Sequence, residues 1–207
     1  MKKVNYKTLI STTLDNFKRD GFYREFTPIM RQVESFPLTK VKFPARKDKP
    51  KADLKIWCTN DYLNMSHNSQ IIETMVEVIR EVGTGSGGTR NISGTSSAIV
   101  NLEKELAVLH GQEKALVFSS GYVAHESRIS TLLSILDDVV VFSDEKNHAS
   151  IINGIKKSNA KKEIFRHNDL SHLEELIKNY PIQKHKVIIF ESVYSMDGDF
   201  GDIESIV

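Results

Sequence analysis

The apolar and polar positions of the chain form helix-like stretches, followed by an alternation of short apolar runs and further helical patterns. Three stretches carry apolar residues at helical spacing and are closely followed by a glycine: residues 6–17, 72–82 and 99–109. Four short apolar runs come later: residues 115–118, 139–142, 164–165 and 187–190. The helix after the third run is expected to begin at Ser171, because Glu174 would complete a capping box. The alternation is typical of βα units and predicts an α/β fold with a mostly parallel sheet.

The first 53 residues are expected to form a short helix and extended segments, of which 35–53 should have no core of its own. Residues 22–26 look extended, and residues 35–53 are rich in lysine and contain three prolines. We therefore expect an N-terminal helix and extended arm over 1–53. A large domain is expected over 54–207, opening with a short strand at 54–58.

Composition narrows the function classes without choosing one. The chain has 207 residues, 40% hydrophobic and 27% charged, with a formal net charge of +1. This balance argues against a nucleic-acid or polybasic membrane surface. No apolar run reaches the ~20 residues that a membrane helix needs, and no secretory signal pattern is present. Cys58 is the single cysteine, and the histidines lack metal-binding spacing, so we expect a cytoplasmic protein with no disulfide and no metal site.

A glycine-rich stretch at residues 83–95 is the first candidate for a functional segment. Its five glycines allow tight turns and close approach of a ligand, and Thr89, Arg90 and Asn91 could hold an anionic substrate. A flexible connection between helices is the simpler alternative. Because the stretch lies between helices rather than after a strand, a dinucleotide-binding fold is disfavoured. A serine hydrolase is disfavoured because the chain has no G-x-S-x-G motif.

Three polar segments follow expected strands: residues 119–122, 143–148 and 191–199. Ligands of open parallel sheets bind beyond the carboxyl ends of the strands. Ser120 and Gly121 open a helix and could bind a phosphate, although an ordinary N-cap serine and turn glycine would look the same. His148 could stack on a flat ligand or move a proton, and Ser195 could hydrogen-bond a ligand. The pattern predicts that Tyr122, His148 and Ser195 converge on one pocket for a planar phosphorylated ligand.

Several motifs resemble those of the pyridoxal-phosphate-dependent α-oxoamine synthase family, and together they span most of the chain. They are WCTNDYL at 57–63, GSGGTRNISGT at 85–95, FSS at 118–120, NHAS at 147–150, IFRHND at 164–169 and FESVYSMDGDFG at 190–201. The TRNISGT form is similar to the aminolevulinate-forming branch in particular. The resemblance implies a fold-type I transferase, in which this chain holds the N-terminal arm and the first part of the large cofactor-binding domain.

The resemblance also implies an activity and a set of site residues. The reaction is an acyltransfer that condenses glycine with succinyl-CoA to 5-aminolevulinate, CoA and carbon dioxide, the first step of tetrapyrrole (heme) biosynthesis, in a homodimer. The cofactor would be pyridoxal 5'-phosphate, contacted through its phosphate or its ring by Ser120, Gly121, Tyr122, His148 and Ser195. The substrate-binding residues would be Asn60 for the glycine carboxylate, Arg24 and Thr89 for the succinyl carboxylate, Asn91 beside them, and Ser143 and Lys162 for the acyl-CoA. The simpler alternatives are a surface cation for Arg24 and a solvated basic stretch for Lys162.

One departure from the family pattern limits this reading. In the family, the Asp that faces the pyridine nitrogen and the Lys that forms the Schiff base come after the strand matching 187–190, and the sequence stops at Val207 before both. We therefore expect an N-terminal portion that is inactive and folds poorly alone, with an exposed sheet edge. The alternatives are another α-oxoamine synthase, forming 2-amino-3-oxobutyrate or 8-amino-7-oxononanoate, or a non-catalytic fragment that binds a partner subunit.

Overall fold

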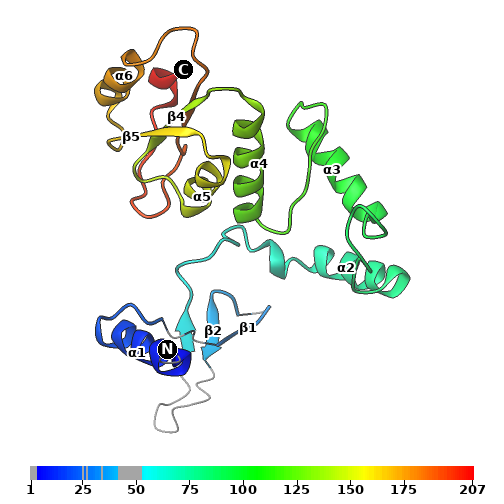
Figure 1. Ribbon diagram of the computed structural model, residues 1–207. Coiled ribbons are helices and arrows are strands. Elements are labelled where there is room, and N and C mark those ends of the chain that lie inside the picture. The colour runs from blue at the N-terminus through cyan, green and yellow to red at the C-terminus, as the bar shows by residue number, and fades with distance from the viewer. Residues whose placement is uncertain (1–3, 25, 27, 34, 42–52) are drawn as a thin grey trace. The chain divides into compact units, whose positions relative to one another are not determined.

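The computed structural model of the chain describes residues 4–24, 26, 28–33, 35–41 and 53–207. The chain divides into two compact units, Met1–Gly85 and Ser86–Val207, and each is described here by itself (Figure 1). None of the described helices has the length and apolar character that crossing a lipid bilayer requires.

The first unit begins with the expected helix, α1, over Tyr6–Arg19. A small antiparallel sheet follows, in the order β1-β2-β3, made of β1 (Ile29–Arg31), β2 (Leu38–Val41) and β3 (Asp53–Lys55). The first part of the extended connection expected over 35–53 is the strand β2, which pairs with both neighbours and buries Thr39, so the sequence reasoning missed this sheet. Residues 42–52 of that connection lie outside the described residues. The expected strand at 54–58 is also shorter, since β3 ends at Lys55.

The first unit ends with the short helix η1 (Met65–His67) and the helix α2 (Ser69–Val82). The side chain of Asn68 caps α2 by accepting a hydrogen bond from the amide of Ile71 at 3.2 Å. The helix stops where the sequence predicts, because Gly83 takes a positive φ of 84°, a conformation that glycine adopts without steric cost.

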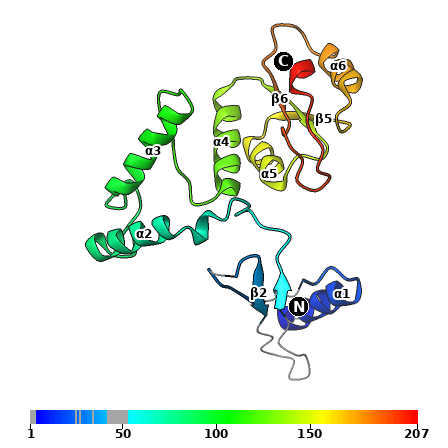
Figure 2. The ribbon, with the colours of Figure 1, turned by 180° about the vertical axis from the view of Figure 1, so that it is seen from behind.

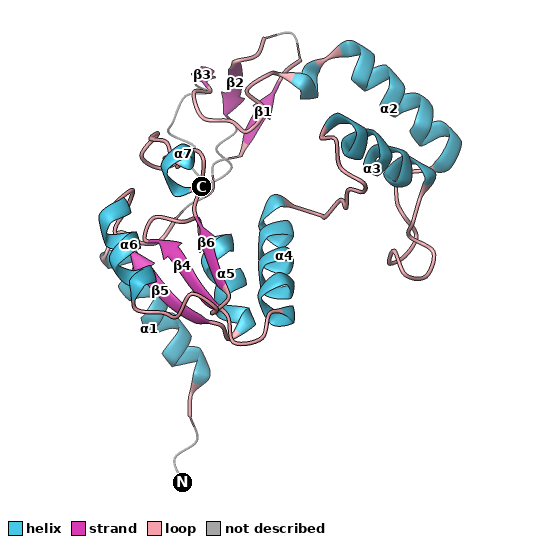
Figure 3. Ribbon diagram, turned by 90° about the horizontal axis from the view of Figure 1, so that it is seen from above, coloured by secondary structure: helices cyan, strands magenta, loops and turns pink. Residues whose placement is uncertain are grey.

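The second unit contains the parallel sheet that the alternating pattern predicts, in the order β5-β4-β6. Its strands are β4 (Val140–Asp144), β5 (Lys161–Phe165) and β6 (Lys186–Ile189), and both pairings with the central β4 are parallel. The helices α5 (Ala149–Ser158) and α6 (Leu170–Lys178) provide the crossovers. Figure 3 shows α6 on one side of the sheet, and α5 with α4 (Gly121–Ile135) on the other. The predicted fold class is therefore confirmed.

Side chains of β4 point alternately into two hydrophobic clusters, as expected of a strand buried on both faces. The first cluster joins α4 and α5 to the sheet and contains Ile129, Leu133, Val139, Val141, Ile151 and Ile155. The second cluster joins α6 to the opposite face and contains Val140, Phe142, Phe165 and Leu173. All five residues of β4 are buried, so this strand anchors the unit.

Two local predictions about the second unit were wrong. Residues 115–118 form no strand, and Figure 2 shows a plain loop between α3 (Ser97–Leu109) and α4. The amide of Val117 instead donates to the carboxylate of Glu103 at 2.8 Å, so a side chain takes the place of a neighbouring strand. The helix α6 begins at Leu170 rather than at Ser171, because the carboxylate of Asp169 caps it by accepting from the amide of His172 at 2.9 Å. A single helical turn, α7 (Ile203–Ile206), follows β6.

Candidate functional site

The carboxyl ends of β4 and β6 are tied together by the segment that follows β4. The amide group of Asn147, which is buried, donates to Ser143 Oγ at 2.9 Å and to the carbonyl of Ile189 at 2.7 Å. The backbone amide of His148 donates to the Glu191 carboxylate at 2.5 Å. The two strand ends therefore meet in a fixed arrangement, at the edge of the sheet where a ligand of this fold class binds.

The N-terminus of α4 lies open beside this edge. Ser120 is the N-cap residue, and its hydroxyl accepts a hydrogen bond from the amide of Val123 at 3.2 Å. A Cβ placed on Gly121 would have no atom within 4 Å, so a ligand can approach the backbone there. The free N–H groups of a helix N-terminus and the helix dipole favour an anion at this place.

Tyr122 and His148 lie side by side. Their ring centroids are 6.1 Å apart and the rings meet edge to face. The hydroxyl of Tyr122 accepts a hydrogen bond from Asn153 on α5, which fixes the ring against the neighbouring helix. His148 caps α5 through Nδ1, which accepts from the amide of Ser150 at 3.2 Å, and its ring is exposed. The structure thus places the N-terminus of α4, predicted to bind a phosphate, beside His148, predicted to stack on a ring. Both of these roles stay predictions.

Ser195 lies on a hairpin that follows β6. The hairpin closes through a bridge between Val193 and Phe200 and through the amide of Tyr194, which donates to the carbonyl of Asp199 at 2.9 Å. Ser195 is exposed, and within the described part of the chain no residue hydrogen-bonds its hydroxyl. Glu191, at the start of the same segment, is the residue that links this hairpin to His148.

His167 anchors the hairpin to the sheet, a role that sequence reasoning missed. Its Nδ1 lies 2.9 Å from the Asp144 carboxylate and its Nε2 lies 2.6 Å from the Asp199 carboxylate. Burial disfavours a charge on the imidazole, but the bonds to the two carboxylates outweigh burial and raise the pKa of His167. The Tyr194 ring packs edge-on against it at 4.4 Å, and burial raises the pKa of Tyr194 to about 12.

The glycine-rich loop is fixed by an ion pair. The Arg90 guanidinium makes two bonds to the Glu103 carboxylate, at 2.5 and 2.9 Å, and together with the bond from the Val117 amide these lower the pKa of Glu103 to about 2. Arg90 is therefore committed to the fold, which corrects its interpretation as an anion-binding group. Thr89 and Asn91 remain exposed on the loop.

Tight packing within that loop explains one of its glycines. A Cβ on Gly94 would lie 1.9 Å from the carbonyl oxygen of Gly88, a distance that no side chain tolerates. The two backbone segments can approach only because this position lacks a side chain.

The remaining predicted residues lie beneath the His148 cluster, on the outer strand or in the other unit. Ser143 belongs to β4 rather than to the loop after it; it is 1% exposed, and its hydroxyl bonds to Asn147 and to the carbonyl of Asp144. Lys162 is exposed on the outer strand β5. Arg24 and Asn60 are exposed residues of the first unit. The substrate-binding roles of these residues stay predictions.

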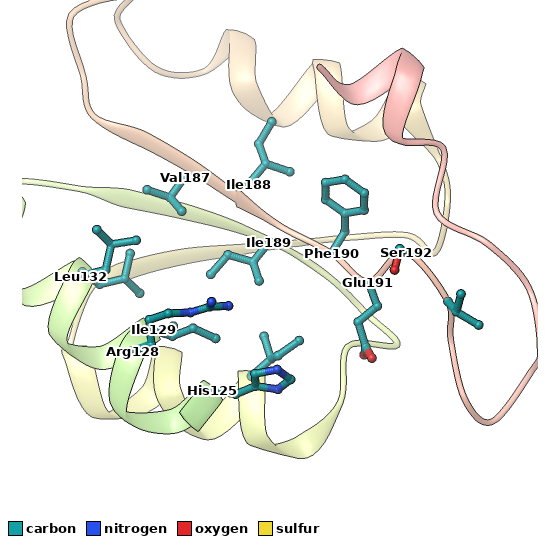
Figure 4. A pocket seen from close by; sticks show the side chains of 13 residues that line it. His125, Arg128, Ile129, Leu132, Val187, Ile188, Ile189, Phe190, Glu191 and Ser192 are labelled. Carbon is teal, nitrogen blue, oxygen red and sulfur yellow. The ribbon is translucent and has the colours of Figure 1, made fainter. Parts of the chain in front are cut away.

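A pocket of about 480 Å³ lies between α4, α5 and the segment 187–193 (Figure 4). Apolar side chains of α4 and β6 form most of its wall, and His125, Arg128 and Glu191 add polar groups. Glu191 contacts both this pocket and the backbone of His148, so the pocket borders the cluster described above.

Comparison with known proteins identifies relatives along nearly the whole chain. The 5-aminolevulinate synthase of Rickettsia prowazekii (strain Madrid E) is 46% identical over 202 residues, which are 98% of this chain and 47% of that protein. The mitochondrial 5-aminolevulinate synthase of Saccharomyces cerevisiae is 46% identical over 202 residues, 98% of this chain and 36% of that protein. The chain thus spans about half or less of the length of these curated relatives.

Two solved structures also match most of this chain and less than half of their own length. A serine palmitoyltransferase from S. paucimobilis with a bound PLP–myriocin aldimine gives a TM-score of 0.79 at 28% identity, covering 99% of this chain and 49% of that one. The 8-amino-7-oxononanoate synthase of Francisella tularensis gives 0.57 at 30% identity, covering 72% of this chain and 40% of that one.

The residues at the N-terminus of α4 and just after β4 suit a pyridoxal phosphate group. The open helix N-terminus at Gly121 offers amide donors to a phosphate, and the exposed His148 ring beside Tyr122 offers a flat surface. The family model for aminotransferase class I and II matches residues 52–207. The chain therefore belongs to the aminotransferase class I and II family, with a fold-type I architecture, and is a homologue of 5-aminolevulinate synthase over the N-terminal half of that enzyme.

Proposed function

We propose that this chain forms the N-terminal part of a pyridoxal-phosphate-dependent acyltransferase that condenses glycine with succinyl-CoA to 5-aminolevulinate, CoA and carbon dioxide. The observation that carries this proposal is the 46% identity to 5-aminolevulinate synthases over 98% of the chain. The cluster of Tyr122, His148 and the open N-terminus of α4 supports it, because these groups suit a planar phosphorylated ligand.

The chain's own residues would hold and orient the cofactor, which when bound supplies an electron sink for the carbanion of glycine. The amides at Ser120, Gly121 and Tyr122 would bind the phosphate. His148 would cover one face of the pyridine ring, held in place by the bond from its amide to Glu191. Ser195 would contact the cofactor from a hairpin that His167 fixes to the sheet.

The resemblance also implies substrate-binding residues, of which all but Ser143 are exposed. Arg24 and Thr89 would bind the distal carboxylate of the succinyl group, and Asn60 the carboxylate of glycine, because guanidinium and amide groups suit carboxylate oxygens. Asn91 lies beside Thr89 on the fixed glycine-rich loop. Ser143 and Lys162 would contact the acyl-CoA, and the intact enzyme would be a homodimer.

Binding of pyridoxal 5'-phosphate to the 207-residue chain tests the cofactor site. Pyridoxal phosphate should bind more tightly than pyridoxal, measured by equilibrium dialysis, because the phosphate gains the α4 amides. Ser120→Ala should weaken that binding by about fivefold, the value of one lost hydrogen bond near the anion. Ser134→Ala, near the other end of α4, is the matched control and should bind as the unmodified chain does. Equal affinities for pyridoxal phosphate and for pyridoxal would overturn the assignment of this site.

We also propose that the 207 residues alone form no 5-aminolevulinate from glycine and succinyl-CoA, because none of their lysines lies where the family's Schiff-base lysine belongs. Release of CoA, followed with a thiol reagent, should stay at the level without protein. Product formation by the purified chain would contradict this proposal.

A second candidate is another α-oxoamine synthase, favoured by the 30% identity to an 8-amino-7-oxononanoate synthase. The candidates differ in the acyl group: the succinyl group has four carbons and ends in a carboxylate, whereas formation of 8-amino-7-oxononanoate needs a seven-carbon acyl group that also ends in a carboxylate, and formation of 2-amino-3-oxobutyrate needs an acetyl group without one. Binding of succinyl-CoA, acetyl-CoA and the CoA thioester of the seven-carbon dicarboxylic acid to the chain should separate them. A preference for succinyl-CoA that Arg24→Gln abolishes supports the first candidate, and a preference for either of the other two thioesters supports the second.

A further inference from the structure

Three polar side chains form a hydrogen-bonded row across the contact between α4 and α5. His125 Nδ1, on α4, lies 3.1 Å from the hydroxyl of Ser150, and the same hydroxyl lies 2.8 Å from Nδ1 of His148. Ser150 is fully buried, whereas His148 is exposed at the candidate cofactor site. The row therefore connects the wall of the 480 Å³ pocket, which His125 lines, with the ring of His148.

Hydrogen-bond directions along the row follow from one group whose role is fixed. The backbone amide of Ser150 can only donate, and it points at Nδ1 of His148 at 3.2 Å. That nitrogen is therefore an acceptor, and the hydrogen of the His148 ring is on Nε2. The hydroxyl of Ser150 then points its single hydrogen at the same nitrogen, so the amide and the hydroxyl share its one lone pair. Since the hydroxyl has no second hydrogen, its lone pair faces His125, and His125 Nδ1 must carry the donated hydrogen.

We propose that His125 is a positioning residue of the cofactor site: its Nδ1–H orients the Ser150 hydroxyl and thereby fixes His148 as the Nε2–H tautomer. His125 makes no contact with a reacting atom in this proposal and acts only through Ser150. Its importance for cofactor binding rests on the proposed function, whereas the hydrogen positions along the row do not.

Close packing of the two helices makes the row possible. A Cβ on Gly154 of α5 would lie 2.9 Å from Cβ of Ile129 and 3.2 Å from the carbonyl oxygen of His125. Only a glycine lets α5 approach α4 this closely, and the approach brings Ser150 within reach of His125. The same contact holds Tyr122, one turn before His125 on α4, against Asn153 of α5. Tyr122 and His125 are thus both fixed by side chains of α5.

Nitrogen NMR of the histidine rings in the 207-residue chain, without cofactor, tests the inference directly. Long-range ¹⁵N–¹H spectra distinguish a protonated from an unprotonated ring nitrogen. In the unmodified chain we expect His125 protonated on Nδ1 and His148 protonated on Nε2. The opposite tautomer at either histidine would overturn the proposal, and this measurement needs no variant.

A matched pair of substitutions tests the role of His125. Asn places its amide nitrogen where histidine has Nδ1 and keeps a donor, whereas Leu has a similar outline and no donor. His125→Leu should shift the tautomer ratio of His148 toward Nδ1–H by about fivefold, the value of one neutral hydrogen bond, and His125→Asn should restore it. His110→Leu, at the end of α3, is the control and should leave the ratio unchanged.

Outcomes of this test separate the inference from the proposed function. An unchanged His148 tautomer in His125→Leu overturns the inference, even if pyridoxal phosphate binds to the chain. The expected tautomers together with no binding of pyridoxal phosphate overturn the proposed function and leave the inference standing. If His125→Asn restores the His148 tautomer ratio of the unmodified chain, the result supports a hydrogen-bonding role for His125 rather than simple packing.

Discussion

Replacing His167 by Phe should cost stability in a way that depends on pH. The ring shape is kept, but the positive charge between Asp144 and Asp199 is lost. The side chain of Asp144 is only 1% exposed, and it keeps two backbone donors, the amides of Lys146 at 2.8 Å and Asn168 at 3.0 Å. Removing one partner of a buried ion pair costs about 3–5 kcal/mol, and the two remaining donors put the expected loss near the lower end, about 3 kcal/mol.

The sign of the pH dependence follows from the raised pKa of His167. A group whose pKa is higher in the folded than in the unfolded chain stabilises the fold. For His167 this stabilisation is fully present below the unfolded pKa of about 6.5 and is lost as the pH rises through the folded pKa. The bond to His167 lowers the pKa of Asp199, so its contribution is present above about 3.9, the unfolded value, and is lost as the pH falls through the folded value. The difference between the unmodified chain and His167→Phe should therefore be largest between about pH 4.5 and 6 and shrink as the pH rises.

Urea unfolding followed by circular dichroism at pH 5.5 and pH 8.5 measures this difference. His167→Asn, which keeps a neutral donor near the Nδ1 position toward Asp144, should lose less than His167→Phe at pH 5.5. His110→Phe controls for the loss of an exposed histidine and should show no pH-dependent difference. A loss from His167→Phe that is equal at the two pH values, or below about 1 kcal/mol at pH 5.5, would refute the reasoning, since breaking a buried pair costs more than that.

Three further substitutions probe other parts of the second unit. Leu133→Ala, at a position only 2% exposed, should lower the free energy of unfolding by about 3 kcal/mol in urea titrations, because it leaves a cavity beneath α4. Gly94→Ala should open the glycine-rich loop to limited proteolysis within residues 83–95, since its Cβ would collide with the carbonyl of Gly88. Arg90→Lys cannot form the paired bonds to Glu103, so amide hydrogen exchange of the loop should accelerate, and unchanged exchange would contradict that role of the ion pair.

Elements with a clear apolar period could be predicted from the sequence, because burial alone decides them. β4 and β6 lie on apolar runs, and α2 ends at Gly83 as expected, whereas β5 has only Ile164 and Phe165 of its expected run and begins at the polar Lys161. Residues 115–118 show the limit of this reasoning: an apolar run indicates burial, whereas a strand also needs a neighbouring backbone. Here Glu103, distant in sequence, takes the amide of Val117.

Two residues near the start of α6 could serve as its N-cap, which explains why the predicted start was wrong. Ser171 and Asp169 are both good N-cap residues, and local sequence favoured Ser171 because of Glu174. Asp169 is the cap in the structure, where its carboxylate also pairs with Arg166 at 2.7 Å. A helix start is therefore decided by side chains that a short motif does not include.

In the candidate site, too, some features could be predicted from the sequence and others could not. The sequence reasoning placed Tyr122 and His148 together, and the structure does bring their rings side by side, although residues 115–118 before Tyr122 form a loop and not the strand on which that reasoning depended. The supporting groups could not be predicted: Arg90 looked like a free cation, and the partners of His125 and His167 lie on other elements. Local sequence patterns indicate where helices and strands lie, whereas the contacts of a side chain depend on the packed fold.

The central place of β4 sets a gradient of protection within the second unit. Its backbone is hydrogen-bonded on both sides and its side chains are covered on both faces, so its amides should be the last to exchange with deuterated water. The segment from Asn147 to Ser150 is joined directly to this slow-opening strand. The glycine-rich loop is held by the Arg90–Glu103 ion pair and belongs to no strand of this sheet, so its amides should exchange sooner.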